Sequence, residues 1–115
     1  MRIFTDPRCL RHRPPDGFPE RPQRLRAILD HLGAAGRVVE GPDERPSAAA
    51  VAARAAVTAV HPESYVERFE RAVERGDSLL DSADNPLGPE TAEAAWGAVT
   101  AVLAAADAAT AGGGA

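Results

Sequence analysis

The chain has 115 residues and a formal net charge of −4, and 44% of its residues are apolar although only 4% are aromatic. This length allows one small domain, and the acidic balance argues against a nucleic-acid-binding protein, whose binding surface normally carries excess positive charge. A single cysteine, Cys9, excludes an internal disulfide and a cysteine-rich zinc site, and it is typical of a protein from a reducing cytoplasm.

The first third of the chain predicts a strand, a long loop and a helix. Residues 2–5 favour a short strand, which ends at the Asp6–Pro7 pair because proline cannot continue a central strand. Residues 8–22 are rich in proline and glycine, so we expect a loop without regular structure there. A helix is expected over residues 21–34, because apolar residues recur at helical spacing and glycines follow them. The apolar stripe consists of Leu25, Ile28, Leu29 and Leu32.

The middle of the chain predicts a second short strand and two further helices. Residues 38–39 favour the strand, and Ser47 is placed to cap an alanine-rich helix over residues 48–60. The next helix begins at Pro62 and stops before Gly76, which gives it a start signal and an end signal. Its apolar face consists of Tyr65, Val66, Phe69 and Val73.

The last part of the chain predicts an acidic loop over residues 77–89, followed by a helix that dissolves in the glycines at 112–114. The apolar residues of this helix are Ala95, Trp96, Val99, Val102, Leu103 and Ala106. Two short strands among four helices indicate an α/β chain. Strands of two or three residues need partners from a larger sheet, so we expect an incomplete domain.

Membrane association is not expected from this sequence. No apolar run approaches the roughly 20 residues that a membrane-spanning helix needs. The N-terminus also lacks the charged-then-apolar pattern of a signal peptide. We therefore expect a soluble, cytoplasmic protein that binds neither membranes nor nucleic acids.

Few residues carry recognisable chemistry. The histidines His12, His31 and His61 include no pair at the i, i+4 spacing that places two imidazoles on one helix face for zinc. We expect His12 to form a hydrogen bond that fixes its loop, His61 to cap or pack at a helix start, and His31 to pack or to lie on the surface. No serine lies in a Gly-x-Ser-x-Gly turn, and no glycine-rich turn follows a strand. The residues alone therefore predict no catalytic group and no metal ligand.

Three ordered stretches carry a more specific pattern: Asp6–His12 with Gly17–Leu25, Val60–Val66, and Asp84–Pro89 with Thr91, Ala94 and Ala95. This pattern resembles the zinc-dependent family of histone deacetylases, acetylpolyamine amidohydrolases and acetoin-utilisation proteins. The family has Asp-x-Arg-x-Leu-x-His, then Gly-His-Pro-Glu-x-Pro-x-Arg-Leu, a Val-His and Tyr-Val segment, and Asp-x-Pro-x-x-Pro-Gly-Thr-x-x-Ala-Ala. Phe18 stands where the family usually has histidine, Glu90 replaces a glycine, and Ala92 replaces a large residue.

The resemblance implies the N-terminal portion of an arginase/deacetylase-like three-layer α/β/α fold with a parallel sheet, mostly helical over residues 1–115. Family members remove acyl groups from acetyllysine, acetylpolyamines or similar amides. In them a zinc held by two aspartates and a histidine activates water, and a tyrosine stabilises the oxyanion. None of those positions matches this chain, and the family's Pro-Pro-Gly-His-His segment is expected just after residue 115.

The implied function is an N-terminal segment of a zinc-dependent deacetylase, with no catalytic residue, metal ligand or cofactor of its own and no activity alone. Its partners would be the remainder of the deacetylase domain and, in the complete zinc enzyme, an acetylated lysine or polyamine substrate. The alternative is a small non-catalytic helical interaction or regulatory module.

Two site residues carry over from the family. By its place in Pro-x-Arg-Leu, Arg24 resembles an arginine that lines the internal channel below the metal, where a fixed cation can hold departing acetate. The alternative is an arginine that ties the loop to the domain. Asp84 resembles the rim aspartate that accepts hydrogen bonds from the substrate backbone, and the alternative is an Asx turn before Pro86.

Overall fold

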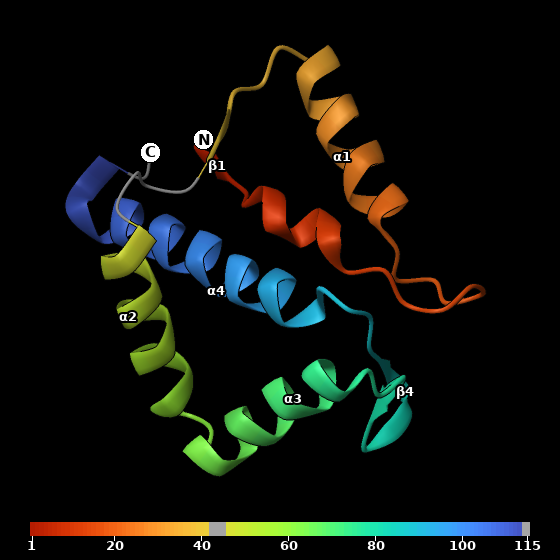
Figure 1. Ribbon diagram of the computed structural model, residues 1–115. Helices are drawn as coiled ribbons and strands as arrows, with labels where there is room; N and C mark the ends of the chain where they lie inside the picture. The colour runs from red at the N-terminus through yellow and green to blue at the C-terminus, as the bar shows by residue number, and fades with distance from the viewer. Residues whose placement is uncertain (42–45, 114–115) are drawn as a thin grey trace.

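A computed structural model of the chain describes residues 1–41 and 46–113. The helix α4 (Thr91–Ala108) runs through the middle of the molecule, between α1 (Pro22–Ala34) on one side and α2 (Pro46–Thr58) and α3 (Glu63–Arg75) on the other (Figure 1). The Cα radius of gyration is 15.3 Å. A compact domain of this length has a radius of about 13 Å, so the elements are arranged more openly than in such a domain.

The two predicted strands pair with each other. β1 (Ile3–Phe4) and β2 (Val39–Glu40) lie parallel, and the first residues of the two strands lie opposite each other. An ion pair between Arg2 and Glu40, at 2.7 Å, ties the two strands together. Within the described residues each of these strands has one partner, so the chain is an α/β structure with a small parallel sheet. The three-layer arrangement stays a prediction.

The stretch predicted as an irregular loop over residues 8–22 begins with a helix, so that prediction is wrong for its first part. A 3-10 helix, η1 (Pro7–Arg11), follows Asp6, whose carboxylate accepts a hydrogen bond from the Arg8 backbone N–H at 2.9 Å. Pro7 suits the first position of a helix, because its φ is already helical and its missing N–H needs no partner there. The prolines further along the stretch obscured this start signal.

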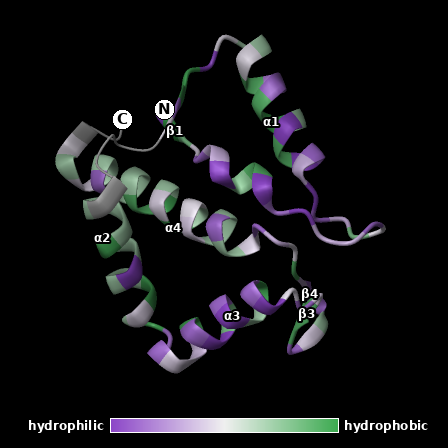
Figure 2. Ribbon diagram, viewed as in Figure 1, coloured by the Kyte–Doolittle hydropathy of each residue, from purple (hydrophilic) through white to green (hydrophobic). Residues whose placement is uncertain are grey.

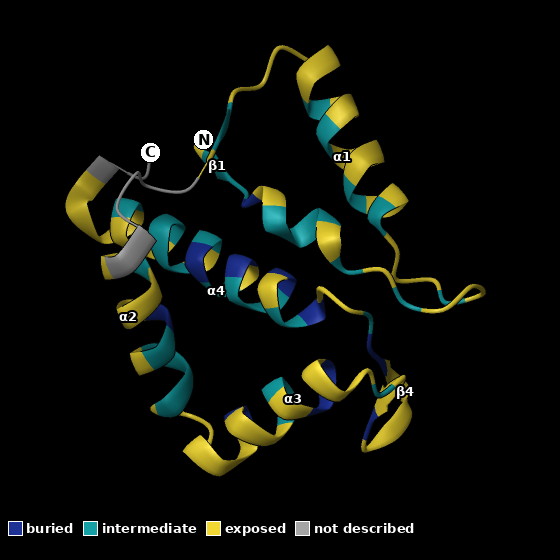
Figure 3. Ribbon diagram, in the orientation of Figure 1, coloured by how far each residue is buried: buried dark blue, intermediate teal, exposed yellow. Residues whose placement is uncertain are grey.

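The helix α1 lies within the predicted range but packs poorly. It has no buried residue, and Ile28 on its apolar stripe is 55% exposed. Figure 3 shows only intermediate and exposed positions along α1, whereas α4 has buried positions at intervals along its first half. The predicted glycine stop is confirmed, since Gly36 has a φ of +68° and Arg37 donates its backbone N–H to the Leu32 carbonyl at 2.9 Å.

The next two helices also confirm the predictions. α2 begins two residues before the predicted start, and the side chain of Ser47, the predicted cap, lies outside the described part of the chain. α3 ends at Gly76, which has a φ of +77° and donates its N–H to the Val73 carbonyl at 3.0 Å. The outward face of α3 is strongly hydrophilic, whereas α2 and α4 are largely apolar (Figure 2).

The acidic loop predicted over residues 77–89 contains a β-hairpin, which corrects that expectation. β3 (Leu79–Leu80) and β4 (Ser82–Pro86) pair antiparallel around Asp81, whose φ is +62°. The stretch has no glycine at this turn and little alternation of apolar residues, so the usual hairpin signals are missing. A small core cluster shared with α3 anchors the hairpin and consists of Ala72, Val73, Leu80 and Leu87, with Phe69 and Ala92 packed against it.

The last helix is confirmed. α4 is longer than the other helices, and it continues into a π-helical turn, η2 (Ala109–Gly113). The expectation that no apolar run is long enough to span a membrane needs correction. The segment Thr91–Gly112 is long and apolar enough by length and composition, and 17% of its most apolar window is buried. One such helix is weak evidence for a membrane protein, because core helices of soluble proteins also meet this criterion of length and composition.

Candidate functional site

Asp84, the predicted substrate-binding residue, lies on β4 with its side chain exposed. The hairpin that carries it is held against α3 by an ion pair between Arg68 and Asp81 and by the buried side chains of Leu80 and Leu87. Among the residues that the structure describes, the Asp84 carboxylate has no hydrogen-bond partner within the chain. The carboxylate is therefore presented to solvent from an anchored hairpin.

A cleft with a volume of about 390 Å³ lies beside Asp84. Three aromatic side chains contribute to its walls, namely Tyr65, Phe69 and Trp96. The His61 ring stacks on Tyr65 with the ring centroids 5.3 Å apart, so the predicted packing role of His61 is confirmed. The Trp96 indole N–H donates to the Glu70 carboxylate at 3.1 Å, which fixes the ring between α3 and α4.

His12 joins the N-terminal segment to the start of α4. Its Nδ1 lies 2.9 Å from the Thr91 hydroxyl oxygen, which also accepts the Gly88 backbone N–H at 2.7 Å. The backbone at Gly88 is so close to the N-terminal loop that a Cβ there would lie 2.4 Å from the Arg13 carbonyl oxygen. The prediction that His12 forms a hydrogen bond that fixes its loop is therefore confirmed.

Arg24, the predicted acetate-channel residue, lies in the first turn of α1 and is exposed. It lines a second cavity, with a volume of about 300 Å³, next to Cys9. Burial raises the pKa of the Cys9 thiol, which keeps it protonated at neutral pH. Both His12 and Glu20 line this cavity as well as the cleft, so the structure places Arg24 and Asp84 on two sides of these residues and not in one pocket.

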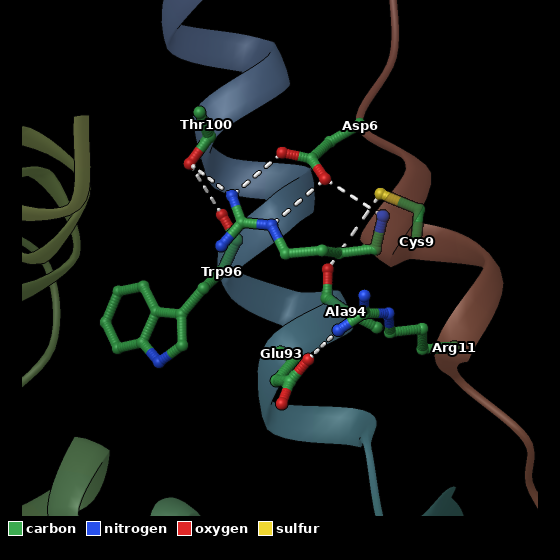
Figure 4. A network of polar contacts seen from close by, with 8 residues as sticks. Asp6, Cys9, Arg11, Glu93, Ala94, Trp96 and Thr100 are labelled. Atoms are coloured by element: carbon green, nitrogen blue, oxygen red, sulfur yellow. Dashed lines mark hydrogen bonds and ion pairs between the residues drawn. The ribbon is translucent and has the colours of Figure 1, made fainter. Parts of the chain in front are cut away.

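A partly buried charge network at the start of η1 was not predicted (Figure 4). Asp6 is 1% exposed, and its carboxylate accepts hydrogen bonds from Arg8 Nε at 3.0 Å and from Arg8 Nη2 at 2.8 Å. Arg8 Nη2 also donates to the Thr100 hydroxyl at 3.3 Å, and that hydroxyl donates to the Trp96 carbonyl at 2.9 Å. The hydrogen bonds from Arg8 lower the pKa of Asp6, and the Asp6 carboxylate raises the pKa of Arg8.

This network holds η1 on α4. Gly97 lets the two elements approach closely, since a Cβ at that position would lie 2.9 Å from Arg8 Cβ and 3.1 Å from Asp6 Cγ. An ion pair between Arg11 and Glu93 adds a second link (Figure 4). Because the carboxylate and the guanidinium are paired with each other, the network is suited to fixing the two elements and not to moving protons. The sequence signal of this network is the Asp-Pro-Arg start of η1. The residue on α4 that it contacts, Thr100, lies far away in the chain, so the contact could not be predicted.

The site residues do not form a metal centre. Within residues 1–41 and 46–113, no group of three or more His, Cys, Asp or Glu side chains is arranged to hold a metal ion. His31 was expected either to pack or to lie on the surface, and it is exposed on α1. The arrangement thus offers an exposed carboxylate, an exposed guanidinium and an aromatic cleft, which are groups that bind and orient a ligand.

The family of the chain follows from its comparison with known proteins. No curated protein and no solved structure matches the chain. The family model of the histone deacetylase domain matches residues 18–114, a range that includes both Arg24 and Asp84. Because this match spans well over half of the sequence, the chain belongs to the histone deacetylase family.

Proposed function

We propose that the chain forms the N-terminal, substrate-side portion of a zinc-dependent deacetylase domain and that it does not hydrolyse amides by itself. The match of residues 18–114 to the histone deacetylase domain carries the proposal. Packing supports it, because α1 has an apolar stripe without a buried residue and the described parallel sheet has two strands. Such surfaces call for further packing partners, which the remainder of a deacetylase domain would supply.

In this proposal Asp84 orients the substrate and Arg24 holds the leaving acetate. Asp84 is suited to its role because its carboxylate is exposed on a hairpin that is anchored by a buried cluster. A carboxylate accepts hydrogen bonds from amide N–H groups, and charge-assisted bonds of this kind are short and directional. Arg24 offers a planar guanidinium, which binds carboxylates through two parallel hydrogen bonds.

Zinc, which the family implies, would supply a Lewis acid and an activated water in the complete enzyme. The side chains in the described part of this chain do not fit the ion, since they include no cluster of potential ligands. We therefore assign no catalytic step to this chain, and the zinc ligands of the proposed enzyme would come from other residues.

An acetate-release assay tests the proposal. The purified chain is incubated with added zinc and either an acetyllysine peptide or an acetylated polyamine, and an active deacetylase serves as the positive control. We expect no acetate above the background of the buffer with zinc. Acetate release that needs zinc and stops on addition of a chelator would overturn the statement that the chain is inactive alone.

One observation favours the alternative, a small non-catalytic helical module. The network of Asp6, Arg8 and Thr100 closes the N-terminus onto α4 within the chain itself. A thermal melt with simultaneous light scattering separates the two functions. A domain portion with exposed apolar faces aggregates when it is heated, whereas a self-sufficient module unfolds and stays a soluble monomer or homodimer.

A further inference from the structure

Three arginines beside the start of α1 differ from most other arginines of the chain. Among the residues that the structure describes, Arg13, Arg21 and Arg26 form no ion pair, and all three are exposed. Seven arginines do form ion pairs, namely Arg2, Arg8, Arg11, Arg54, Arg68, Arg71 and Arg75. The charges of the three exposed guanidiniums are therefore presented to solvent.

The three arginines line one hollow, which has a volume of about 340 Å³ and lies between the loop and the start of α1. One carboxylate, Asp16, also lines it, so the hollow has an excess of positive charge. The surrounding segment, residues 11–37, contains six arginines and three carboxylates, whereas the rest of the chain contains seven arginines and fourteen carboxylates. The hollow thus lies in a positive region of an otherwise acidic protein, and such a region attracts anions.

The loop that carries Arg13 is held against α4. The preceding residue, His12, has its Nδ1 2.9 Å from the Thr91 hydroxyl oxygen. A Cβ at Gly88 would lie 2.4 Å from the Arg13 carbonyl oxygen, so the two backbones are in close contact. A site whose backbone is fixed before a ligand arrives loses less conformational entropy on binding.

The lining of the hollow favours carboxylates over a compact phosphate. Phosphate sites are commonly built from converging backbone N–H groups, but three residues of this lining are prolines, which have none. They are Pro14, Pro15 and Pro22. A guanidinium binds a carboxylate through two parallel hydrogen bonds. Asp16 adds an acceptor for a peptide N–H, so carboxylates spaced along a peptide reach the arginines while its backbone donates to Asp16.

Nucleic acid fits the hollow less well. The bases of a single strand stack on aromatic side chains, and the hollow contains one aromatic residue, Phe18, which is half-buried. A long polyanion also extends beyond the hollow, over a protein whose net charge is −4. A short acidic peptide contacts the positive region alone.

We infer that this hollow is a docking site for an acidic segment of a partner protein, whose Asp or Glu side chains pair with Arg13, Arg21 and Arg26. The loop projects at the edge of the molecule, where another protein can reach it (Figure 1). The inference goes beyond the proposed function, because it requires neither zinc nor amide hydrolysis. Arg24 lines a different cavity, so its proposed role with acetate is separate from this site.

Fluorescence anisotropy on the purified chain tests the inference, with a fluorescein-labelled peptide that carries a run of glutamates as the probe. The comparison probes are the same peptide with glutamine in place of every glutamate and a labelled single strand of DNA, all at one ionic strength. Unlabelled inorganic phosphate serves as a competitor. We expect saturable binding of the acidic peptide that weakens as salt is added, and weaker binding of both comparison probes.

Charge-removing variants locate the site. We expect Arg13→Gln, Arg21→Gln and Arg26→Gln each to weaken binding of the acidic peptide about threefold, within the range of an exposed charge pair, and the triple variant to weaken it by at least about tenfold. Arg71→Gln is the matched control. It removes the same charge from the exposed face of α3, outside the hollow, and should bind within about twofold of the wild type. Far-UV circular dichroism verifies that the variants are folded.

Several outcomes would overturn the inference. They are no saturable binding of the acidic peptide up to about 1 mM chain, unchanged binding in the triple variant, an equal loss in Arg71→Gln, and equal binding of the neutral peptide. Tighter binding of the DNA strand, or displacement of the peptide by phosphate at constant ionic strength, would assign the hollow to phosphate groups instead. The acetate-release assay is read separately, since zinc-dependent turnover would contradict the proposed function and leave the peptide binding standing.

Discussion

Replacing Gly97 by alanine tests whether the close contact between η1 and α4 stabilises the fold. A Cβ at this position would lie 2.9 Å from Arg8 Cβ and 3.1 Å from Asp6 Oδ1. Carbon atoms in van der Waals contact lie about 3.5–4.0 Å apart, so either η1 moves away or the buried pair is distorted. In both cases the substitution acts on the hydrogen bonds that join the N-terminal segment to the central helix.

Opposing contributions set the size of the effect. Alanine is favoured over glycine inside a helix by about 1 kcal/mol, which stabilises the variant. Overpacking costs about 1–3 kcal/mol, and a weakened hydrogen bond to a charged group adds about 1 kcal/mol to the loss. With about 2 kcal/mol for overpacking, about 1 kcal/mol for the hydrogen bond and a gain of about 1 kcal/mol from helix propensity, we expect the free energy of unfolding to fall by about 2 kcal/mol.

Urea unfolding followed by far-UV circular dichroism measures this difference, and Gly33→Ala is the matched control. Gly33 is also helical, but apart from its chain neighbours and the backbone of its own helix no described atom lies within 4 Å of the Cβ that alanine would add there. Only helix propensity then operates, and Gly33 lies in the last turn of α1, where the gain is smaller than in a helix interior, so Gly33→Ala should stabilise the chain by about 0.5 kcal/mol. If Gly97→Ala were stabilised as much as Gly33→Ala, the close packing of η1 on α4 would be refuted.

Three further predictions concern individual contacts. Asp6→Asn should lower the free energy of unfolding by about 2 kcal/mol at pH 7. Because folding lowers the pKa of Asp6, the wild-type advantage is complete above the unfolded-state pKa of about 3.9 and is lost as the pH falls through the lower folded-state pKa. Urea titrations at pH 7 and pH 3 measure it, and a difference independent of pH would contradict the assignment. A double-mutant cycle of His12→Ala and Thr91→Val should give a coupling energy of about 1 kcal/mol in the same assay, whereas simple additivity would show that their bond contributes nothing. Arg68→Ala breaks an exposed ion pair with Asp81 and should change the thermal midpoint by an amount equivalent to at most about 0.5 kcal/mol, less at high salt; a large, salt-independent loss would mean that the hairpin depends on this pair.

The helices could be predicted because their signals are local. Pro22 before the apolar stripe of α1, and the left-handed glycines Gly36 and Gly76 after α1 and α3, lie within a few residues of the structure they specify. The strands β1 and β2 could be placed to within a residue, but their mutual pairing could not, because two-residue strands carry no information on register.

The elements that were missed depend on contacts between distant residues. The 3-10 helix η1 is fixed by Thr100 and Glu93, and the hairpin is fixed by the buried cluster that it shares with α3. The site, too, was predicted only where its signals are local. Family motifs pointed to Asp84 and Arg24. That these residues line different cavities, with His12 and Glu20 between them, depends on how the loop packs and could not be predicted from spacing in the sequence.

The bond between Arg8 and Thr100 joins residues that are 92 positions apart. At a translation rate of about 5–20 residues per second, the ribosome needs about 5–20 s to make the intervening chain. During that time Asp6 and Arg8 remain in water, because α4, on which they pack, is not yet complete. The pair of Arg68 and Asp81, separated by 13 positions, is completed much sooner. The hairpin and α3 are thus able to assemble on the nascent chain before the N-terminus closes onto α4.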